Sequence, residues 1–78
     1  MSTEKRALAR AIELAGGQSE LARRLTELTG EPVSQSTVSM WMTAYDGRCS
    51  PSLARYIELI TGVSASDLRP DYYGEIAL

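Results

Sequence analysis

The sequence predicts an all-α protein, a small bundle of four main helices followed by a short fifth helical turn. Its 78 residues are rich in Ala and Leu, contain no Phe and show no sustained alternation of apolar and polar residues. Half-buried β-strands require such an alternation. Apolar residues instead recur at spacings of three and four between clear helix starts and stops. This length allows one domain with a small core.

The first two helices are delimited by capping residues and glycines. Ser2 or Thr3 can cap the first helix, and the pair Gly16-Gly17 ends it. The second helix is predicted to begin at Gln18 and to end at Gly30, because a proline two residues later prevents its continuation. Its predicted inner face consists of Leu21, Ala22, Leu25 and Leu28.

The third and fourth helices begin with strong start signals. Ser34 can cap a third helix over residues 35–43, in which Val38 and Trp41 share one face. Ser50-Pro51 predicts the start of the fourth helix, because a capping hydroxyl precedes a proline at the first helical position.

A short turn and a tail complete the predicted organisation. Ser64 and Asp67 have the spacing of a capping box, and Pro70 is expected to close the turn that they open. Residues 1–71 therefore form the predicted helical domain, and residues 72–78 form a C-terminal tail. The predicted core consists of Leu8, Ile12, Leu21, Leu25, Val38, Trp41, Leu53, Ile57 and Ile60.

The composition excludes several classes of site. The chain has no His and a single Cys, which rules out an intramolecular disulfide, the usual zinc sites and His-based acid/base chemistry. We therefore expect no metal, no cofactor and no enzymatic activity, with Cys49 inert or partly exposed. No apolar run approaches membrane-spanning length and no leader resembles a signal peptide, so we expect a cytoplasmic protein without a membrane partner.

Charge and polarity point in different directions on nucleic-acid binding. The net charge of −2 counts against it, because neutralisation of phosphates supplies most non-specific affinity. The third helix, however, carries Gln35, Ser36 and Ser39 away from its apolar face, and none of these is charged. Gln can bond adenine at two positions and Ser can bond any base, whereas ordinary helix surfaces carry Glu, Lys and Arg. A plain solvated surface is the alternative.

Two segments together resemble a known DNA-binding motif. Residues 18–25, Gln-Ser-Glu-Leu-Ala-Arg-Arg-Leu, and residues 33–41, Val-Ser-Gln-Ser-Thr-Val-Ser-Met-Trp, resemble the helix-turn-helix of phage repressors and Cro. This is the lambda repressor-like class of DNA-binding domain. In that class the glutamine that opens the first helix holds a phosphate and the one that opens the second helix contacts a base. The resemblance gives these roles to Gln18 and Gln35.

The following segment narrows the resemblance. Residues 56–71 lead from a closing helix through Thr-Gly-Val into Leu68-Arg69-Pro70-Asp71. This ending is similar to that of the YdaS-like and Cro-like small regulators encoded in prophages. The resemblance extends over residues 18–71, most of the chain.

The chain departs from that family in two ways. The family joins the two helices through a single Gly, whereas residues 26–32 occupy that place here. Some of them are expected to extend the second helix by about one turn. The recognition helix also has no Lys or Arg, so it must contact adenine and thymine edges or use arginines from outside the helix.

The resemblance implies a sequence-specific transcriptional regulator, a Cro-like repressor, that binds a double-stranded DNA operator as a homodimer. The predicted base contacts are Gln35, Ser36 and Ser39. The predicted phosphate contacts are Gln18, Ser34, Thr37, Arg48 and Arg55. For the two arginines, a surface ion pair is an equal alternative.

Assembly and partner have alternatives of their own. The apolar residues of the tail, Tyr72, Tyr73 and Ile76, are candidates for the dimer contact, and the alternative is that the tail folds back on its own core. The alternative function is an antitoxin-type module that binds a toxin partner and regulates its own operon. YdaS-like proteins are often described in those terms.

Overall fold

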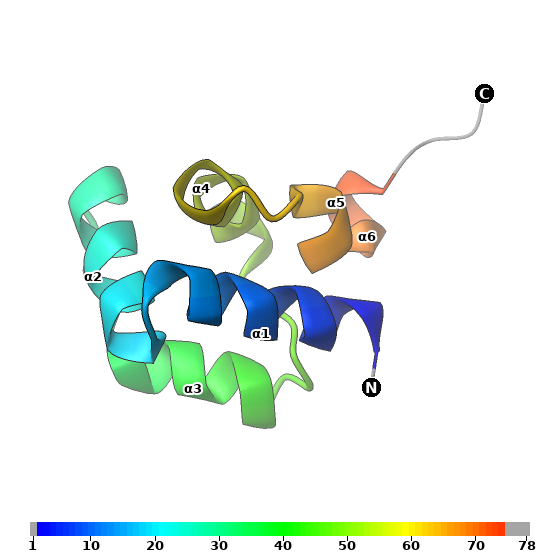
Figure 1. Ribbon diagram of the computed structural model, residues 1–78, viewed down its shortest axis with the longest axis horizontal. Coiled ribbons are helices and arrows are strands. Elements are labelled where there is room, and N and C mark those ends of the chain that lie inside the picture. The colour runs from blue at the N-terminus through cyan, green and yellow to red at the C-terminus, as the bar shows by residue number, and fades with distance from the viewer. Residues whose placement is uncertain (1, 75–78) are drawn as a thin grey trace.

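The computed structural model of the protein describes residues 2–74, which form six helices and contain no β-strand (Figure 1). The helices are α1 (Thr3–Ala15), α2 (Gln18–Thr29), α3 (Gln35–Thr43), α4 (Pro51–Thr61), α5 (Ala65–Leu68) and α6 (Pro70–Tyr73). The all-α class is confirmed. The four main helices begin where their capping signals predict.

Side-chain capping explains three of the six described helix starts. The Ser2 side chain accepts a hydrogen bond from the backbone N–H of Lys5 at 3.2 Å, and the Ser34 side chain accepts one from Thr37 at 3.2 Å. The Ser64 side chain accepts a bond from the N–H of Ser66. Each hydroxyl satisfies one of the donors that a helix start leaves unpaired. The side chain of the predicted cap Ser50 makes no bond to the backbone of α4, and its hydroxyl instead lies 3.1 Å from that of Ser52.

Two threonines of α2 hold the connection between α2 and α3, and Thr29 accepts the backbone N–H of Glu31 at 3.1 Å. The Thr26 hydroxyl donates to the carbonyl of Ala22 at 2.9 Å and accepts the backbone N–H of Val33, also at 2.9 Å. The predicted extension of the second helix is confirmed, because α2 continues to Thr29. The intervening residues therefore form a loop whose far end is attached directly to α2.

The core lies between α1, α2, α4 and α5, and α3 closes it on one side by packing mainly against α2. Large residues and alanines contribute together. The buried apolar residues are Leu8, Ala11, Ala15, Leu21, Ala22, Leu25, Val38, Trp41, Cys49, Ala54, Ile57, Val63, Ala65 and Leu68. Among the predicted core residues, Ile12, Leu53 and Ile60 are only partly buried and pack against this cluster.

The structure corrects one prediction about apolar residues and decides between the alternatives of another. Leu28 was expected on the inner face of α2 but is 47% exposed. It lies on the last turns of α2, where this side of the helix is less completely covered. Cys49 was expected to be either inert or partly exposed, and its burial with 1% exposure favours the first alternative.

The C-terminal segment also differs from its prediction. The turn opened by Ser64 ends at Leu68, before Pro70, as predicted. Pro70 also begins a further helix, α6, that was not predicted, because proline is well suited to a first helical position. The Tyr73 hydroxyl donates to the carbonyl of Pro51 at 2.8 Å, so this part of the predicted tail folds back on the domain. Tyr72 is 66% exposed, and Ile76 lies outside the described residues.

Candidate nucleic-acid interface

The exposed surface of α3 carries hydrogen-bonding groups without charge. Gln35 and Ser36 are exposed and Ser39 is half-buried, while Val38 and Trp41 are turned into the core. In Figure 1, α3 runs along the lower edge of the molecule, so this surface faces outward. The three residues predicted to contact bases therefore lie on one helix, on its outer side, while the inner side of that helix is packed into the core.

The N-terminus of α3 offers a second kind of binding group. The hydroxyl groups of Ser34 and Thr37 lie 3.1 Å apart, and Ser34 caps the helix. Within residues 2–74, the backbone N–H groups of Gln35 and Ser36 have no hydrogen-bond acceptor. Unpaired N–H groups and the positive end of the helix dipole favour an anion at this position.

Gln18 opens α2 directly after Gly17 and is half-buried. Figure 1 shows the beginning of α2 next to α3, and these two helices form the most extensive helix pair in the fold. The first turn of α2, which carries Gln18, therefore belongs to a helix that packs directly against α3.

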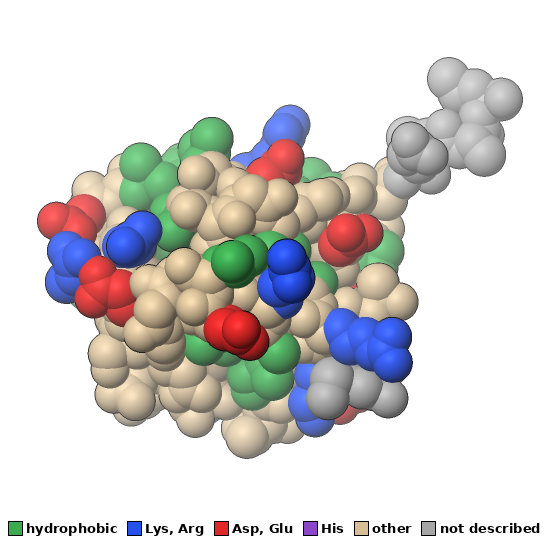
Figure 2. All heavy atoms as spheres, viewed as in Figure 1, with side chains coloured by type: hydrophobic (Ala, Val, Ile, Leu, Met, Phe, Trp, Pro, Cys, Tyr) green, Lys and Arg blue, Asp and Glu red, His purple; other side chains and the backbone are tan. Residues whose placement is uncertain are grey.

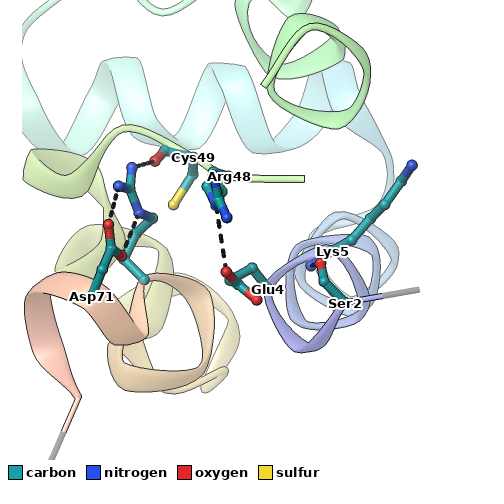
Figure 3. Close-up of polar contacts among 7 residues, drawn as sticks. Ser2, Glu4, Lys5, Arg48, Cys49 and Asp71 are labelled. Atoms are coloured by element: carbon teal, nitrogen blue, oxygen red, sulfur yellow. Dashed lines mark hydrogen bonds and ion pairs between the residues drawn. The ribbon is translucent and has the colours of Figure 1, made fainter. Parts of the chain in front are cut away.

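Arg48 lies in the loop after α3 and is paired across the fold. Its Nε lies 3.4 Å from Oε2 of Glu4, and the arginine side chain is 55% exposed (Figure 3). In the same region, Nζ of Lys5 lies 4.0 Å from Oδ1 of Asp46. Both cations are therefore held near the C-terminal end of α3 by exposed pairs with acids.

A groove runs between α3 and the loop that follows it. It brings Thr37 of α3 together with Arg48, whereas Arg55 does not line it. The guanidinium of Arg55 instead lies 5.7 Å from the ring centre of Tyr73. The groove is lined by Thr37, Met40, Trp41, Ala44, Tyr45, Asp46, Arg48, Cys49, Ser50, Pro51 and Arg69.

Arg69 was not among the predicted site residues, although it belongs to the Leu68–Asp71 ending on which the family resemblance rests. Its Nη1 donates to the carbonyl of Cys49 at 2.7 Å, and its Nε and Nη2 donate to the two carboxylate oxygens of Asp71 at 3.0 and 2.6 Å (Figure 3). Its side chain is only 13% exposed. The arginine thereby fixes the loop that carries Arg48 to the C-terminal helices.

The Arg69–Asp71 pair also shifts the acid–base behaviour of both residues. The hydrogen bonds from Arg69 hold the pKa of the Asp71 carboxyl below its usual range. The same bonds raise the pKa of the Arg69 guanidinium, which therefore stays charged. The only signal in the sequence was the Leu68-Arg69-Pro70-Asp71 ending, because nothing local shows that this arginine reaches Cys49.

Comparison with protein families matches the chain over residues 8–77 to the family described as bacterial toxin YdaS. The chain belongs to this family. The match takes in α2, α3 and the Arg69–Asp71 ending, and it confirms the YdaS-like resemblance. The family description names a toxin, whereas the alternative function predicted from the sequence is that of an antitoxin-type module. Comparisons with curated proteins and with solved structures found no match.

In this YdaS-family chain, the positive charges on the exposed side of α2 are largely balanced by neighbouring acids. Arg23 pairs with Glu20 and, through Nη1, with Oε1 of Glu27 at 2.5 Å. Arg24 lies 3.5 Å from Glu20. Hydrogen bonding from Arg23 lowers the pKa of Glu20, so this acid stays ionised beside the arginines. The arginines of α2 therefore add little net positive potential near α3.

The remaining chemistry of this YdaS-family chain is limited. Burial raises the pKa of the Cys49 thiol to about 11, which keeps it protonated at neutral pH. Within residues 2–74, no cluster of three or more acidic, Cys or His side chains is arranged to hold a metal ion. No described helix combines the length and apolar character needed to cross a membrane.

Proposed function

We propose that this YdaS-family protein is a sequence-specific DNA-binding regulator, a repressor of the Cro type, that places α3 in the major groove. The observation that carries the proposal is the uncharged, hydrogen-bonding surface of α3, backed by the buried Val38 and Trp41. A groove-binding helix needs an inner face that fixes its position and an outer face that matches base edges.

Base contacts fall to the first half of α3. Gln35 can bond an adenine at N6 and N7 together, and Ser36 and Ser39 can donate to or accept from the neighbouring base edges. Because α3 has no Lys or Arg, we expect a preference for A·T-containing half-sites at these positions.

Phosphate contacts come from residues around the helix. Gln18, Ser34 and Thr37 lie at the first turns of α2 and α3, where N–H groups favour an anion. Arg48 can exchange its exposed pair with Glu4 for a phosphate, because such pairs contribute little stability. Arg55 is exposed and would act from α4.

We also propose that two copies bind one operator, in the cytoplasm. A motif of this size covers only a few base pairs, so affinity comes from two half-sites about one helical turn apart. Because Tyr73 is bonded to Pro51, a contact between copies through the tail would depend on Tyr72 and on residues beyond the described part.

A second candidate function is a protein-binding role within a toxin–antitoxin pair. The family description favours it, as does the absence of charge on the outer surface of α3. The two functions are compatible, because members of such pairs can also regulate their own operon. They differ in whether the outer surface of α3 contacts DNA bases or a partner protein. Measuring the DNA affinity of single variants distinguishes the two functions.

The experiment compares Gln35→Ala with Arg48→Ala. An operator is first selected from random duplexes at physiological salt, and each variant is then titrated with salt on that operator and on a scrambled duplex. Gln35→Ala should remove about 1–3 kcal/mol from operator binding and much less from scrambled DNA. Arg48→Ala should weaken both and reduce the salt slope by about one.

Arg23→Ala is the matched control, because this exposed arginine is paired with acids on α2 outside the proposed interface. It should leave the operator preference unchanged. If Gln35→Ala lowers both affinities equally, or neither, α3 does not read bases through that residue. The protein-binding function would then be the better account.

A further inference from the structure

An apolar surface formed by α2 and α4 is unused by the proposed function. Leu28 and Leu59 are 47% and 74% exposed, and with Ile60 they line a shallow groove between the two helices. Arg24 and Glu27 complete the lining of this groove. We call these five residues the α2–α4 face. In Figure 2, hydrophobic side chains gather in this region of the view, at the upper left.

The α2–α4 face lies away from the proposed DNA-binding surface. Figure 1 shows the C-terminal end of α2 beside α4 at the upper edge of the molecule, with α3 at the lower edge. The groove between α2 and α4 shares none of its lining residues with the groove beside α3. A partner on this face would therefore leave α3 accessible.

The charges on the α2–α4 face indicate what covers it. Arg24 and Glu27 are three residues apart on the helix surface, and their side chains are 45% and 64% exposed. On their own helix Arg24 lies 3.5 Å from Glu20 and Glu27 pairs with Arg23, but exposed pairs of this kind contribute little stability and can exchange partners. A patch with one cation and one anion beside an apolar centre is complementary to itself. A two-fold axis through such a patch brings Arg24 of each copy to Glu27 of the other and apposes the apolar residues.

We propose that the α2–α4 face is a contact between two copies of this chain. The leucines supply the apolar centre, and the two Arg24–Glu27 pairs set the antiparallel orientation. This proposal does not depend on DNA binding, because it concerns the isolated protein. It is also distinct from pairing along an operator, since the contact leaves the two α3 helices on opposite sides of the assembly.

The first experiment measures self-association of the full chain without DNA by sedimentation equilibrium. Leu28→Glu and Leu59→Glu should each raise the dimer dissociation constant by at least about tenfold, because each buries a carboxylate in the apolar centre. Met40→Glu is the matched control, since Met40 has the same 47% exposure as Leu28 but lies on α3. A wild-type chain that stays monomeric, or an equal loss in Met40→Glu, would overturn the proposal.

The second experiment exchanges the charges. Arg24→Glu alone and Glu27→Arg alone each create two like-charge contacts across the two-fold axis, so each variant should be monomeric. An equimolar mixture of the two should associate, because both cross-contacts are then opposite in charge. Circular dichroism and thermal melting of each variant confirm that it is folded. Two folded variants that do not associate when mixed would refute the two-fold arrangement.

Discussion

Trp41 connects the outer surface of α3 to the core. It is 4% exposed and lies one helical turn after the fully buried Val38, so both side chains anchor α3 from its inner face. The sequence predicted this role from spacing alone, because residues three apart share one side of a helix. Gln35 is exposed at the first position of the helix that these two side chains anchor.

Replacing Trp41 with Ala should lower the free energy of unfolding by about 3–5 kcal/mol, because a large buried ring is lost and a cavity remains. Urea denaturation followed by circular dichroism measures the change. Met40→Ala is the control on the same helix, since Met40 is 47% exposed and its loss should change little. A Trp41→Ala protein with an unchanged transition would contradict the core position.

The candidate site was predictable from the sequence where its residues act locally. Ser34 caps α3 and Gln35 opens it, and both follow from neighbours within one turn. The contact from Arg69 to the carbonyl of Cys49 spans 20 residues and joins two loops, so no local pattern shows it. The pairing of Arg48 with Glu4 likewise spans 44 residues.

Asp71→Asn should lower the melting temperature at neutral pH, because the carboxylate that pairs with Arg69 is lost. In the wild type the pKa of Asp71 is lowered, so the stabilisation is present above the ordinary aspartate pKa of about 3.9 and is lost as the pH falls through the lower folded-state value. The difference between wild type and variant should therefore vanish at strongly acid pH.

Calorimetry from pH 7 downwards tests the pH dependence of the Asp71 contribution. Glu31→Gln provides the matched control, because Glu31 is exposed and makes no ion pair within residues 2–74. Its melting curve should follow that of the wild type at every pH. A difference for Asp71→Asn that stays constant down to acid pH would show that the charge of this aspartate is not the cause.

At the level of helices, alanines determine how closely the elements approach. Ala22 is buried on the inner face of α2 as predicted, whereas the buried Ala54 of α4 and Ala65 of α5 were not predicted. Periodicity identifies the inner face of a helix, but it does not reveal how near the next helix lies. The error at Leu28 has the same origin, because the spacing placed it on the inner face while the cover over the end of α2 is set by tertiary packing.

The loop after α3 approaches α1 so closely that one position has no room for a side chain. Gly47 has φ +85°, and a Cβ added there would lie 2.4 Å from Cβ of Lys5. Gly30 has a similar φ of +77°, but its Cβ would meet no atom within 4 Å. A substitution at Gly30 therefore destabilises the fold only through the backbone conformation. A substitution at Gly47 adds a steric clash with Lys5.

Gly47→Ala should lower the free energy of unfolding clearly more than Gly30→Ala. The second variant pays only for the left-handed backbone, about 1–2 kcal/mol. The first adds a clash that forces α1 and the loop apart. Denaturant titration of both variants measures the difference. Equal losses would mean that the approach of the loop to Lys5 is relaxed in solution.

At the level of the whole molecule, the C-terminal helices hold the loop between α3 and α4 and the start of α4 in place. Tyr73 of α6 donates to the carbonyl of Pro51 at the start of α4, and Arg69 holds the loop before it. The sequence predicted a C-terminal tail over residues 72–78, with Tyr72, Tyr73 and Ile76 as its apolar exceptions. The actual contact depends on residues about 20 positions apart.

Tyr73→Phe should lower the free energy of unfolding by about 1–2 kcal/mol, because a part-buried hydrogen bond is lost and the Pro51 carbonyl loses its donor. Tyr72→Phe is the matched control, since Tyr72 is 66% exposed. Thermal melting of both variants distinguishes them. If both behave as wild type, α6 does not contribute to stability through this hydroxyl.

The Thr26 hydroxyl has a consequence for protein engineering. Because it attaches Val33 directly to α2, and because Val38 and Trp41 are buried, we expect the orientation of α3 to depend little on the path of residues 30–32. Lengthening that loop adds only closure entropy, about 0.6 kcal/mol for each doubling of its length. A fluorophore or a peptide tag inserted there would therefore report on the protein while α3 keeps its place.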